Sequence, residues 1–334
     1  MNHDSLTVER KVQLTGGSTY TVSLPKKWAD RQGIEPGTPV RLHVRGDRLV
    51  MSRGEEPDDD SPGTTIDAST QEPATLGLSV AAAYIAGCER LRVENLGNGG
   101  KRRAVRRAIR RFVGLEVMTE TEQSLSARTM LDVAELSPSQ TLAQIERTAL
   151  DMHHESIEAL VSAEGDLGEQ VAGQDDTVDR LFALVSRGFQ RSLVDPAVTT
   201  EGDRSPFEYY MAARQLERIA DHAEKIARLS GRLTEPPPTD IAEEFETLGE
   251  RSRSLVRRAL AGLLDTGDAD FGDVVADAET LRAGLAGLDE RLYERGVSEG
   301  YLLGLVVDSL VRTTEYGLNI VEAGMQARHR AERR

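Results

Sequence analysis

Carboxylates at helical spacing are the residues of this chain with the clearest chemical potential. Asp175 and Asp179 stand four residues apart, and so do Glu217 and Asp221 further along the chain. Residues four apart on an α-helix lie on the same face, so each pair would present two carboxylates together. Two such helices packed as antiparallel neighbours would bring the four acids into an oxygen-rich pocket, a geometry that helical bundles use for di-metal sites.

Neighbouring residues leave both extra ligands and a competing interpretation open. Asp176 and His222 directly follow acids of the two pairs and could add ligands. Arg214, Lys225 and Arg228 lie at pairing distance along the second helix, so the acids could instead belong to a solvated, salt-bridged face. The second pair lies roughly 100° or more around from the centre of that helix's apolar stripe, which predicts a site at the bundle surface.

Six long helical periodicities must position these acids. The third helix of each set of three reads alike, RQLERIADHAEKIA in the first set and DSLVRTTEYGLNIV in the second, which indicates an internal duplication. A run of three prolines separates the sets, so we expect one three-helix bundle over residues 137–235 and a second over residues 239–334. The periodicities cover residues 140–164, 167–194, 206–233, 240–265, 270–295 and 299–331.

The sequence RQLERIADHAEKIA resembles the signature of the PhoU family of phosphate-transport regulators, and GQDDTVDRL resembles that family's acidic motif. The resemblance covers roughly residues 138–331. It implies a pair of three-helix bundles that bind iron, zinc or manganese through surface acidic pairs, and a protein that restrains phosphate uptake when phosphate is plentiful. The metal ligands that it implies are Asp175, Asp179, Glu217 and Asp221.

The second repeat departs from the family's pattern. It keeps only two of the four acids, Glu279 and Glu315, and Tyr316 stands at the position equivalent to His222. We therefore expect a degenerate bundle without a full acid cluster, whose corresponding face is a candidate for docking or dimerisation.

Residues 1–56 read as a small β-rich module. The segments VQL, TYTVSL, VRLHV and RLVMS partly alternate polar and apolar residues as strands do, and a Gly46-Asp47 turn would join the last two. The intervening KKWADRQGI is long enough for one or two helical turns, and Pro36-Gly37 predicts a turn after it. So small a core usually needs a partner, and we expect a homodimer.

The segments VSLPKKW and GIEPGTPV resemble the AbrB/SpoVT family of swapped-hairpin DNA-binding dimers. Residues 1–53 hold nine basic and five acidic residues, a charge of +4 within a chain of −15, and local positive charge is what phosphate contacts require. The loop before TYTVSL reads TGGSTY, where many DNA-binding members carry an arginine, so a module that only dimerises is the alternative. Arg45 and Arg48 at the hairpin tip are weaker candidates for contact. The candidate DNA contacts are Arg10, Lys11, Lys26, Lys27 and Arg31.

Two further segments connect the module to the bundles. Residues 54–73 hold seven acids, no base and three prolines, which predicts an acidic linker over residues 57–73. Residues 74–136 predict a small α/β insert with the order helix, strand, helix and two strands. The second of these helices has a cationic side that could bind phosphate, nucleic acid or the acidic surface of its own neighbour. Its cations are Lys101, Arg102, Arg103, Arg106, Arg107, Arg110 and Arg111.

The expected fold class is mainly α with a small β N-terminal domain. No nucleophile elbow, Cys/His pair, zinc-finger spacing or nucleotide fingerprint occurs, so we expect a protein that is not an enzyme. An enzyme of metal-assisted hydrolysis would need an open ligand position on an exposed metal.

With a single cysteine, Cys88, no signal-peptide pattern and no apolar run of about 20 residues, we expect a cytoplasmic protein without membrane insertion.

Two functions follow from these resemblances. The first is a phosphate-responsive transcription regulator, in which the helical region senses the state of the cell and the N-terminal dimer binds DNA. The second is an adaptor that holds the ATPase of a phosphate ABC transporter inactive and uses the N-terminal module only to dimerise.

Overall fold

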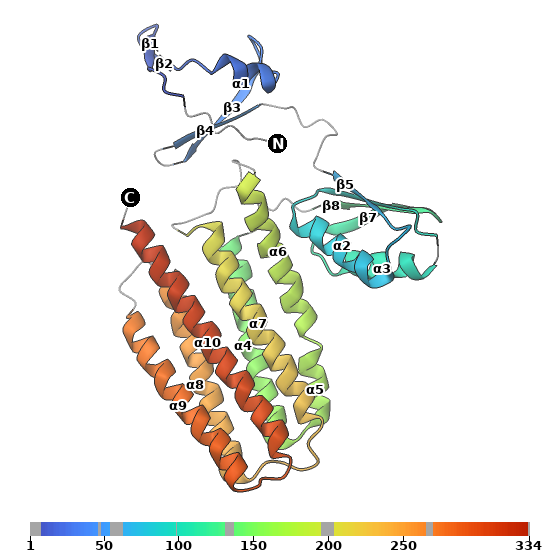
Figure 1. Ribbon diagram of the computed structural model, residues 1–334, viewed down its shortest axis with the longest axis vertical. Helices are drawn as coiled ribbons and strands as arrows, with labels where there is room; N and C mark the ends of the chain where they lie inside the picture. Colours follow the sequence, from blue (N-terminus) through green and yellow to red (C-terminus); the bar gives the residue numbers. More distant parts are fainter. Residues whose placement is uncertain are drawn as a thin grey trace. The chain divides into compact units, whose positions relative to one another are not determined.

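The structure, a computed structural model, describes residues 8–45, 48–53, 63–97, 99–130, 137–194, 204–264 and 270–332. The chain divides into two compact units, Met1–Asp60 and Ser61–Arg334 (Figure 1). The first contains short strands and one short helix, and the second is mainly helical, as the sequence predicts.

The N-terminal unit consists of two β-hairpins joined by a short helix. β1 pairs antiparallel with β2 through a turn in which Gly16 and Gly17 have φ values of 64° and 81°, a left-handed conformation that favours glycine. β3 pairs antiparallel with β4, and the predicted Gly46-Asp47 turn between them lies outside the described residues. The elements are β1 (Gln13–Thr15), β2 (Thr19–Thr21), α1 (Lys26–Arg31), β3 (Val40–Arg45) and β4 (Arg48–Arg53).

The second predicted strand is shorter than the sequence indicates. The segment TYTVSL predicts a strand over residues 19–24, but β2 ends at Thr21, where its pairing with Gln13 of β1 also ends. Val22 and Leu24 continue beyond the paired region with exposed side chains. The pattern therefore predicts more strand than one copy of the chain can pair.

The described residues of the N-terminal unit form no hydrophobic core in a single copy. None of the side chains described between residues 8 and 51 is buried. Apolar residues of both hairpins are exposed instead, with Tyr20 and Val44 each 77% accessible. Burying a large apolar side chain stabilises a protein by roughly 1.5–3 kcal/mol. With these side chains exposed, one copy of the unit does not gain that hydrophobic stabilisation.

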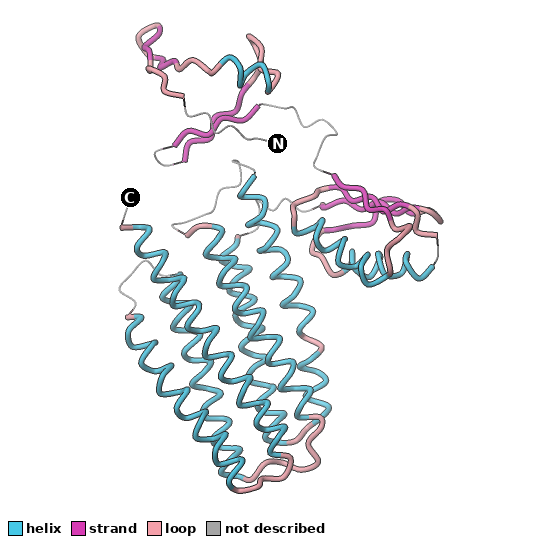
Figure 2. The backbone as a smooth tube through the Cα atoms, in the orientation of Figure 1, coloured by secondary structure: helices cyan, strands magenta, loops and turns pink. Residues whose placement is uncertain are grey.

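The second unit begins with an α/β insert. Its four-stranded sheet has the order β5-β6-β8-β7, in which only β5 and β6 are parallel. Both helices cover the same face, where Tyr84 and Ile109 pack with Val93 and Leu125 of the strands (Figure 2). The elements are β5 (Gly63–Asp67), α2 (Pro73–Ile85), β6 (Arg90–Glu94), α3 (Gly99–Arg110), β7 (Leu115–Glu120) and β8 (Ser124–Thr129).

The acidic linker predicted over residues 57–73 is partly wrong, because β5 occupies residues 63–67. This strand has one buried apolar side chain, Ile66, so its composition gives almost no strand signal. It is held by parallel pairing with β6 and by the Asp67 carboxylate, which accepts hydrogen bonds from the Ser69 amide (2.8 Å) and from Asn95 Nδ2 (3.0 Å).

The six predicted helical periodicities are confirmed, with one break. The segment predicted as a single helix over residues 167–194 is interrupted at Gly173 and Gln174, where Gly173 is the C-cap of α5. Ser137 and the Ser205/Glu208 capping box supply side-chain caps where helices begin. The helices are α4 (Pro138–Ser162), α5 (Gly165–Ala172), α6 (Asp175–Val194), α7 (Pro206–Ser230), α8 (Thr239–Leu264), α9 (Phe271–Glu294) and α10 (Gly300–Ala331).

The two helical sets share one core through their third helices. α7 packs against α4, α5, α6 and α10, whereas α10 packs against α7, α8 and α9 (Figure 1). The predicted apolar stripe of α7, which includes Leu216 and Ile219, is fully buried. Within the described residues, no helix combines the length and apolar character needed to cross a bilayer.

Close contact of α5 with α7 depends on Gly168. A Cβ atom there would overlap the carbonyl oxygen of Ala227, which is backbone and cannot move aside alone. We expect Gly168→Ala to lower the free energy of unfolding by about 1–3 kcal/mol. Gly77→Ala in α2 is the control, since a Cβ there meets nothing within 4 Å and should stabilise by about 0.4–1 kcal/mol. Urea denaturation followed by circular dichroism measures both, and equal effects would contradict the close-packing argument.

Candidate functional site

The four predicted acids come together where α6 and α7 pack, at what we call the acidic seam (Asp175, Asp179, Glu217 and Asp221). Asp175 and Asp179 lie on the first turns of α6, and the other two lie near the middle of α7. The Asp179 carboxylate raises the pKa values of Asp175, Glu217 and Asp221, so acids of both helices lie close enough to interact.

Burial and mutual repulsion disfavour ionisation of the seam. Burial is the largest cause that raises the pKa of Asp175 to about 7, and the Asp179 carboxylate is the second. The pKa of Glu217 also rises to about 7, by burial and then by Asp221. The pKa values of Asp179 and Asp221 are raised as well, chiefly by burial. The seam is therefore a place that attracts positive charge or protons.

Two oxygen atoms of the seam lack hydrogen-bond partners. Asp175 Oδ1 and Glu217 Oε2 are buried without one, and the Glu217 side chain is only 14% exposed. Among the described residues, however, no group of three or more His, Cys, Asp or Glu side chains is arranged to hold a metal ion. The seam thus offers unsatisfied carboxyl oxygens without a closed coordination shell.

An arginine of the insert provides one counter-charge. Arg111, directly after α3, places Nη2 2.6 Å from Asp179 Oδ2 and 3.6 Å from Asp176 Oδ1. Of the roles left open for the cationic helix, the structure thus shows pairing with the acidic surface of its own neighbour. Arg102 and Arg106 instead pair with Glu120 of the adjacent strand β7.

A fully buried arginine fixes the insert against α6. Arg187 Nη1 donates to the backbone carbonyls of Tyr84 (2.6 Å) and Cys88 (3.0 Å), and its guanidinium lies 4.9 Å from the centre of the Tyr84 ring. Burial lowers the pKa of Arg187. Among the described residues, its Nε and Nη2 atoms have no hydrogen-bond partners. Burial of this incompletely paired charge therefore costs folding free energy.

The two predicted extra ligands are not drawn into the seam. His222 turns towards α10, where its ring centre lies 5.7 Å from that of Tyr316 and its Nε2 lies 3.4 Å from the Tyr316 hydroxyl. Burial is the main cause that lowers the pKa of His222. Asp176 is largely exposed and lies at the edge of the Arg111 contact.

Glu224 is a member of the acidic surface that the sequence reasoning missed. It raises the pKa values of Asp175, Asp179 and Asp221, and it accepts from Arg228 Nη2 at 2.6 Å. Its position three residues after Asp221 was enough to place it on the same helix face. Of the basic residues considered as partners along α7, only Arg214 pairs with a seam acid, at 3.5 Å from Glu217.

The second repeat does not reproduce the seam. Glu315 pairs with Arg312 of its own helix at 2.8 Å, and Glu279 is exposed on α9.

The candidate DNA contacts of the N-terminal unit are all exposed. Lys26, Lys27 and Arg31 come from α1, and Arg10 and Lys11 precede β1. The side chains of Arg45 and Arg48 lie outside the described residues. The exposed cations leave a positive surface available in each copy of the unit.

The fold and the site together define a two-repeat helical protein with an acidic seam, joined to a small unit of β-hairpins. Residues 142–230 match the family described as PhoU domain, and residues 13–58 match the family described as "Antidote-toxin recognition MazE, bacterial antitoxin". One segment of the chain is therefore similar to the PhoU domain and the N-terminal segment is MazE/AbrB-like, as the sequence resemblances indicate.

Two curated relatives carry the name "Phosphate-specific transport system accessory protein PhoU homolog". The one from Synechocystis sp. is 24% identical over 162 residues, which is 46% of this chain and 70% of the relative. The one from Clostridium acetobutylicum is 25% identical over 108 residues, so this chain spans 49% of that relative's length. The crystal structure of PhoU from Pseudomonas aeruginosa aligns with a TM-score of 0.46 and 19% identity, covering 57% of this chain and 94% of that one.

The raised pKa of Glu217 predicts a pH-dependent stability. The folded state holds this proton up to pH of about 7, whereas the unfolded carboxyl releases it near 4.5, so the contribution to stability is lost as pH rises between these values. In metal-free protein, the free energy of unfolding of Glu217→Gln should fall less between pH 5 and pH 8 than that of the wild type. We expect the two falls to differ by at least about 1 kcal/mol. Urea denaturation at both pH values tests this, with the exposed Glu279→Gln as control. An unchanged pH slope in Glu217→Gln would contradict the assignment.

Proposed function

We propose that this chain is a regulator of phosphate uptake that binds DNA and restrains phosphate transport genes when phosphate is plentiful. The observation that carries the proposal is the joining of two segments in one chain: a PhoU domain at residues 142–230 and a MazE/AbrB-like segment at residues 13–58. The curated relatives of the first are named as phosphate transport accessory proteins. The proposed role is regulatory and requires no catalysis.

The N-terminal unit acts as a homodimer in this proposal. Exposed apolar side chains such as Tyr20, Leu42 and Val44 would be covered by a second copy, which supplies the core that one copy lacks. The charge of +4 over residues 1–53 then doubles, so the dimer offers a positive surface to the phosphate backbone of DNA.

Transition-metal binding at the acidic seam belongs to the same proposal. Iron, zinc or manganese would supply the positive charge that the seam lacks, held by Asp175, Asp179, Glu217 and Asp221. The unpartnered oxygens of Asp175 and Glu217 support this fit. Because these carboxyls must lose their protons to ligate, occupancy would rise with pH around neutrality. Arg111 would compete with the ion for Asp179.

A second candidate function is an adaptor that inhibits a phosphate ABC transporter through its ATPase. The observation that favours it is the name of the curated relatives, which places them as accessory proteins of a transport system. The turn between β1 and β2 also lacks an arginine, which suits a module that only dimerises.

Chromatin occupancy of the tagged protein in phosphate-replete and phosphate-starved cells separates the two functions. Peaks upstream of phosphate-uptake genes that change with phosphate support the regulator. If no site is enriched in either condition and the transporter ATPase co-purifies with the chain, the adaptor is the function.

The DNA contacts are tested by a double substitution, Lys26→Gln with Lys27→Gln. We expect weaker binding to all DNA sequences and a shallower dependence on salt, by about one unit of log–log slope for each DNA phosphate that is no longer neutralised. Fluorescence anisotropy over a salt series measures both. Lys225→Gln with Arg228→Gln removes the same charge from α7 and should leave binding unchanged; an equal weakening in both variants would point to net charge alone.

The metal ligands are tested by two changes with opposite expected signs. Asp179→Asn should weaken Mn²⁺ binding at least tenfold, whereas Arg111→Gln should strengthen it, because the competing guanidinium is gone. Calorimetric titration of chelator-treated protein and elemental analysis of protein purified without chelator provide the readouts. Glu279→Gln in the second repeat is the matched control. Absence of stoichiometric metal in the wild-type protein would remove this part of the proposal.

A further inference from the structure

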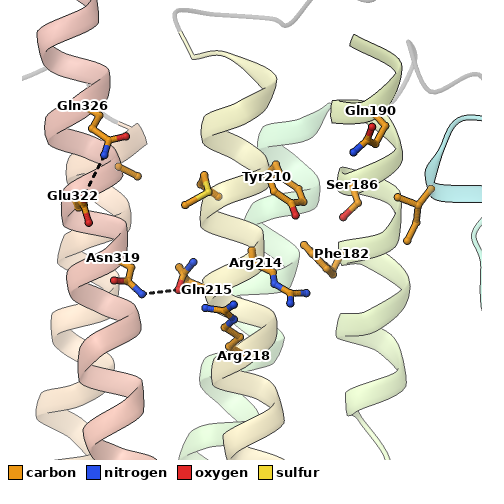
Figure 3. Close-up of a pocket in the computed structure, with 13 residues that line it drawn as sticks. Phe182, Ser186, Gln190, Tyr210, Arg214, Gln215, Arg218, Asn319, Glu322 and Gln326 are labelled. Atoms are coloured by element: carbon orange, nitrogen blue, oxygen red, sulfur yellow. Dashed lines mark hydrogen bonds between the residues drawn. The ribbon is translucent and has the colours of Figure 1, made fainter. Parts of the chain in front are cut away.

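A groove of about 680 Å³ runs along the outer face of α7, beside the acidic seam. α7 provides its floor, and α6 and α10 provide its sides (Figure 3). Ile85 of the insert also lines it. None of the functions proposed above uses this groove.

Two arginines one turn apart line the floor. Arg214 lies 5.3 Å from the centre of the Phe182 ring on α6, and Arg218 lies 5.6 Å from the centre of the Tyr316 ring on α10. In the part of the chain that the structure describes, Arg218 has no hydrogen bond or ion pair, and Arg214 has only its 3.5 Å pairing with Glu217. Both arginines lower the pKa values of Glu217 and Asp221 in the seam, and their remaining guanidinium donors are available at the groove.

A buried hydroxyl on α6 points to a missing partner. Ser186 is only 3% exposed, and its Oγ has no hydrogen-bond partner among the residues that the structure describes. Figure 3 shows this oxygen directed from α6 towards α7, on the same side as the Tyr210 side chain. A buried hydroxyl without a partner costs about 1–3 kcal/mol, so a ligand that bonds to it regains that energy.

The remaining polar groups of the groove add little negative charge. Gln215 accepts a hydrogen bond from Asn319 Nδ2 at 3.1 Å, which leaves the amide NH₂ of Gln215 able to donate. Glu322 is the one carboxylate that lines the groove, and it is exposed and bonded to Gln326 at 3.2 Å. Among the residues that line the groove, two cations lie against one peripheral carboxylate, whereas Glu217 and Asp221, which also interact with these arginines, belong to the seam and do not line it. The lining itself therefore favours an anionic ligand.

We propose that this groove binds a phosphate group, with Arg214 and Arg218 as its charge partners and the Ser186 hydroxyl as a further donor. Guanidinium groups recognise phosphate oxygens through charge-assisted hydrogen bonds, which are stronger than neutral ones. The groove extends well beyond one tetrahedral ion, and the aromatic and apolar side chains of Phe182, Tyr210 and Met211 border the rest of it. The ligand is either free phosphate or the phosphate of an ester with a flat or apolar remainder.

Arg214 would link this groove to the acidic seam. It pairs with Glu217 and lowers the pKa values of both Glu217 and Asp221. A bound phosphate would share the charge of Arg214 and so weaken its hold on the seam. The site would let the proposed regulator respond to phosphate directly, but it rests on the groove's residues and requires neither DNA nor a transporter.

Calorimetric titration of the full chain at constant ionic strength tests the site with three probes: sodium phosphate, AMP and adenosine. We expect saturable binding of phosphate or AMP that weakens at least tenfold in Arg218→Gln and severalfold in Ser186→Ala. Arg228→Gln removes the same charge from a position on α7 outside the groove and should bind as the wild type does. Stronger binding of phosphate than of AMP would identify the free ion as the ligand, and the reverse order with no binding of adenosine would identify an ester.

Three results would overturn the proposal: no saturable binding of phosphate or AMP up to about 10 mM, binding that is unchanged in Arg218→Gln, or adenosine binding as well as AMP. Circular dichroism of each variant verifies that it is folded. Because Ser186→Ala removes only a hydroxyl without a partner, it should fold even if an arginine variant does not. DNA binding is measured separately, so failure of this site is distinguishable from failure of the proposed function.

Discussion

The packing of α7 against α4, α5, α6 and α10 determines where polar groups can lie in the helical unit. The apolar stripe of α7 is buried in the core. The polar residues of α7 therefore lie on its remaining surface, next to its contacts with α6 and α10. Carboxylates follow the line towards the start of α6. Arginines follow the outer face, with Arg214 three residues before Glu217 and Arg218 three residues before Asp221. Both sets of charges are therefore positioned by the same buried contacts, and Arg214 belongs to both.

The helices and the acidic seam could be predicted because both depend on local periodicity. A spacing of four residues places Asp175 with Asp179, and Glu217 with Asp221, whatever the rest of the chain does. Antiparallel packing of neighbouring helices then leaves few ways for the pairs to avoid one another. The break between α5 and α6 was missed because the segment holds three glycines, Gly168, Gly173 and Gly188, and only the one at Gly173 marks a helix end.

Contacts between segments far apart in the sequence could not be predicted in this way. Arg111 meets Asp179 across 68 residues, and Arg187 reaches the carbonyl of Tyr84 across 103. An arginine on a helix normally indicates an exposed position, so the burial of Arg187 has no local signature. β5 is a similar case, since its strand conformation comes from β6 rather than from its own acidic sequence. The groove also depends on side chains from four elements, which no single motif describes.

The contact of His222 with Tyr316 bears on how a duplicated protein diverges. These residues occupy equivalent positions in the two repeats, and they face each other where α7 meets α10. Two repeats of identical sequence would place the same side chain on both sides of this contact. Two histidines there would repel each other whenever both were protonated, and two tyrosines would crowd the same space. Different residues at the two positions avoid that conflict. Where equivalent positions of two repeats contact each other, the fold therefore favours different residues in the two repeats.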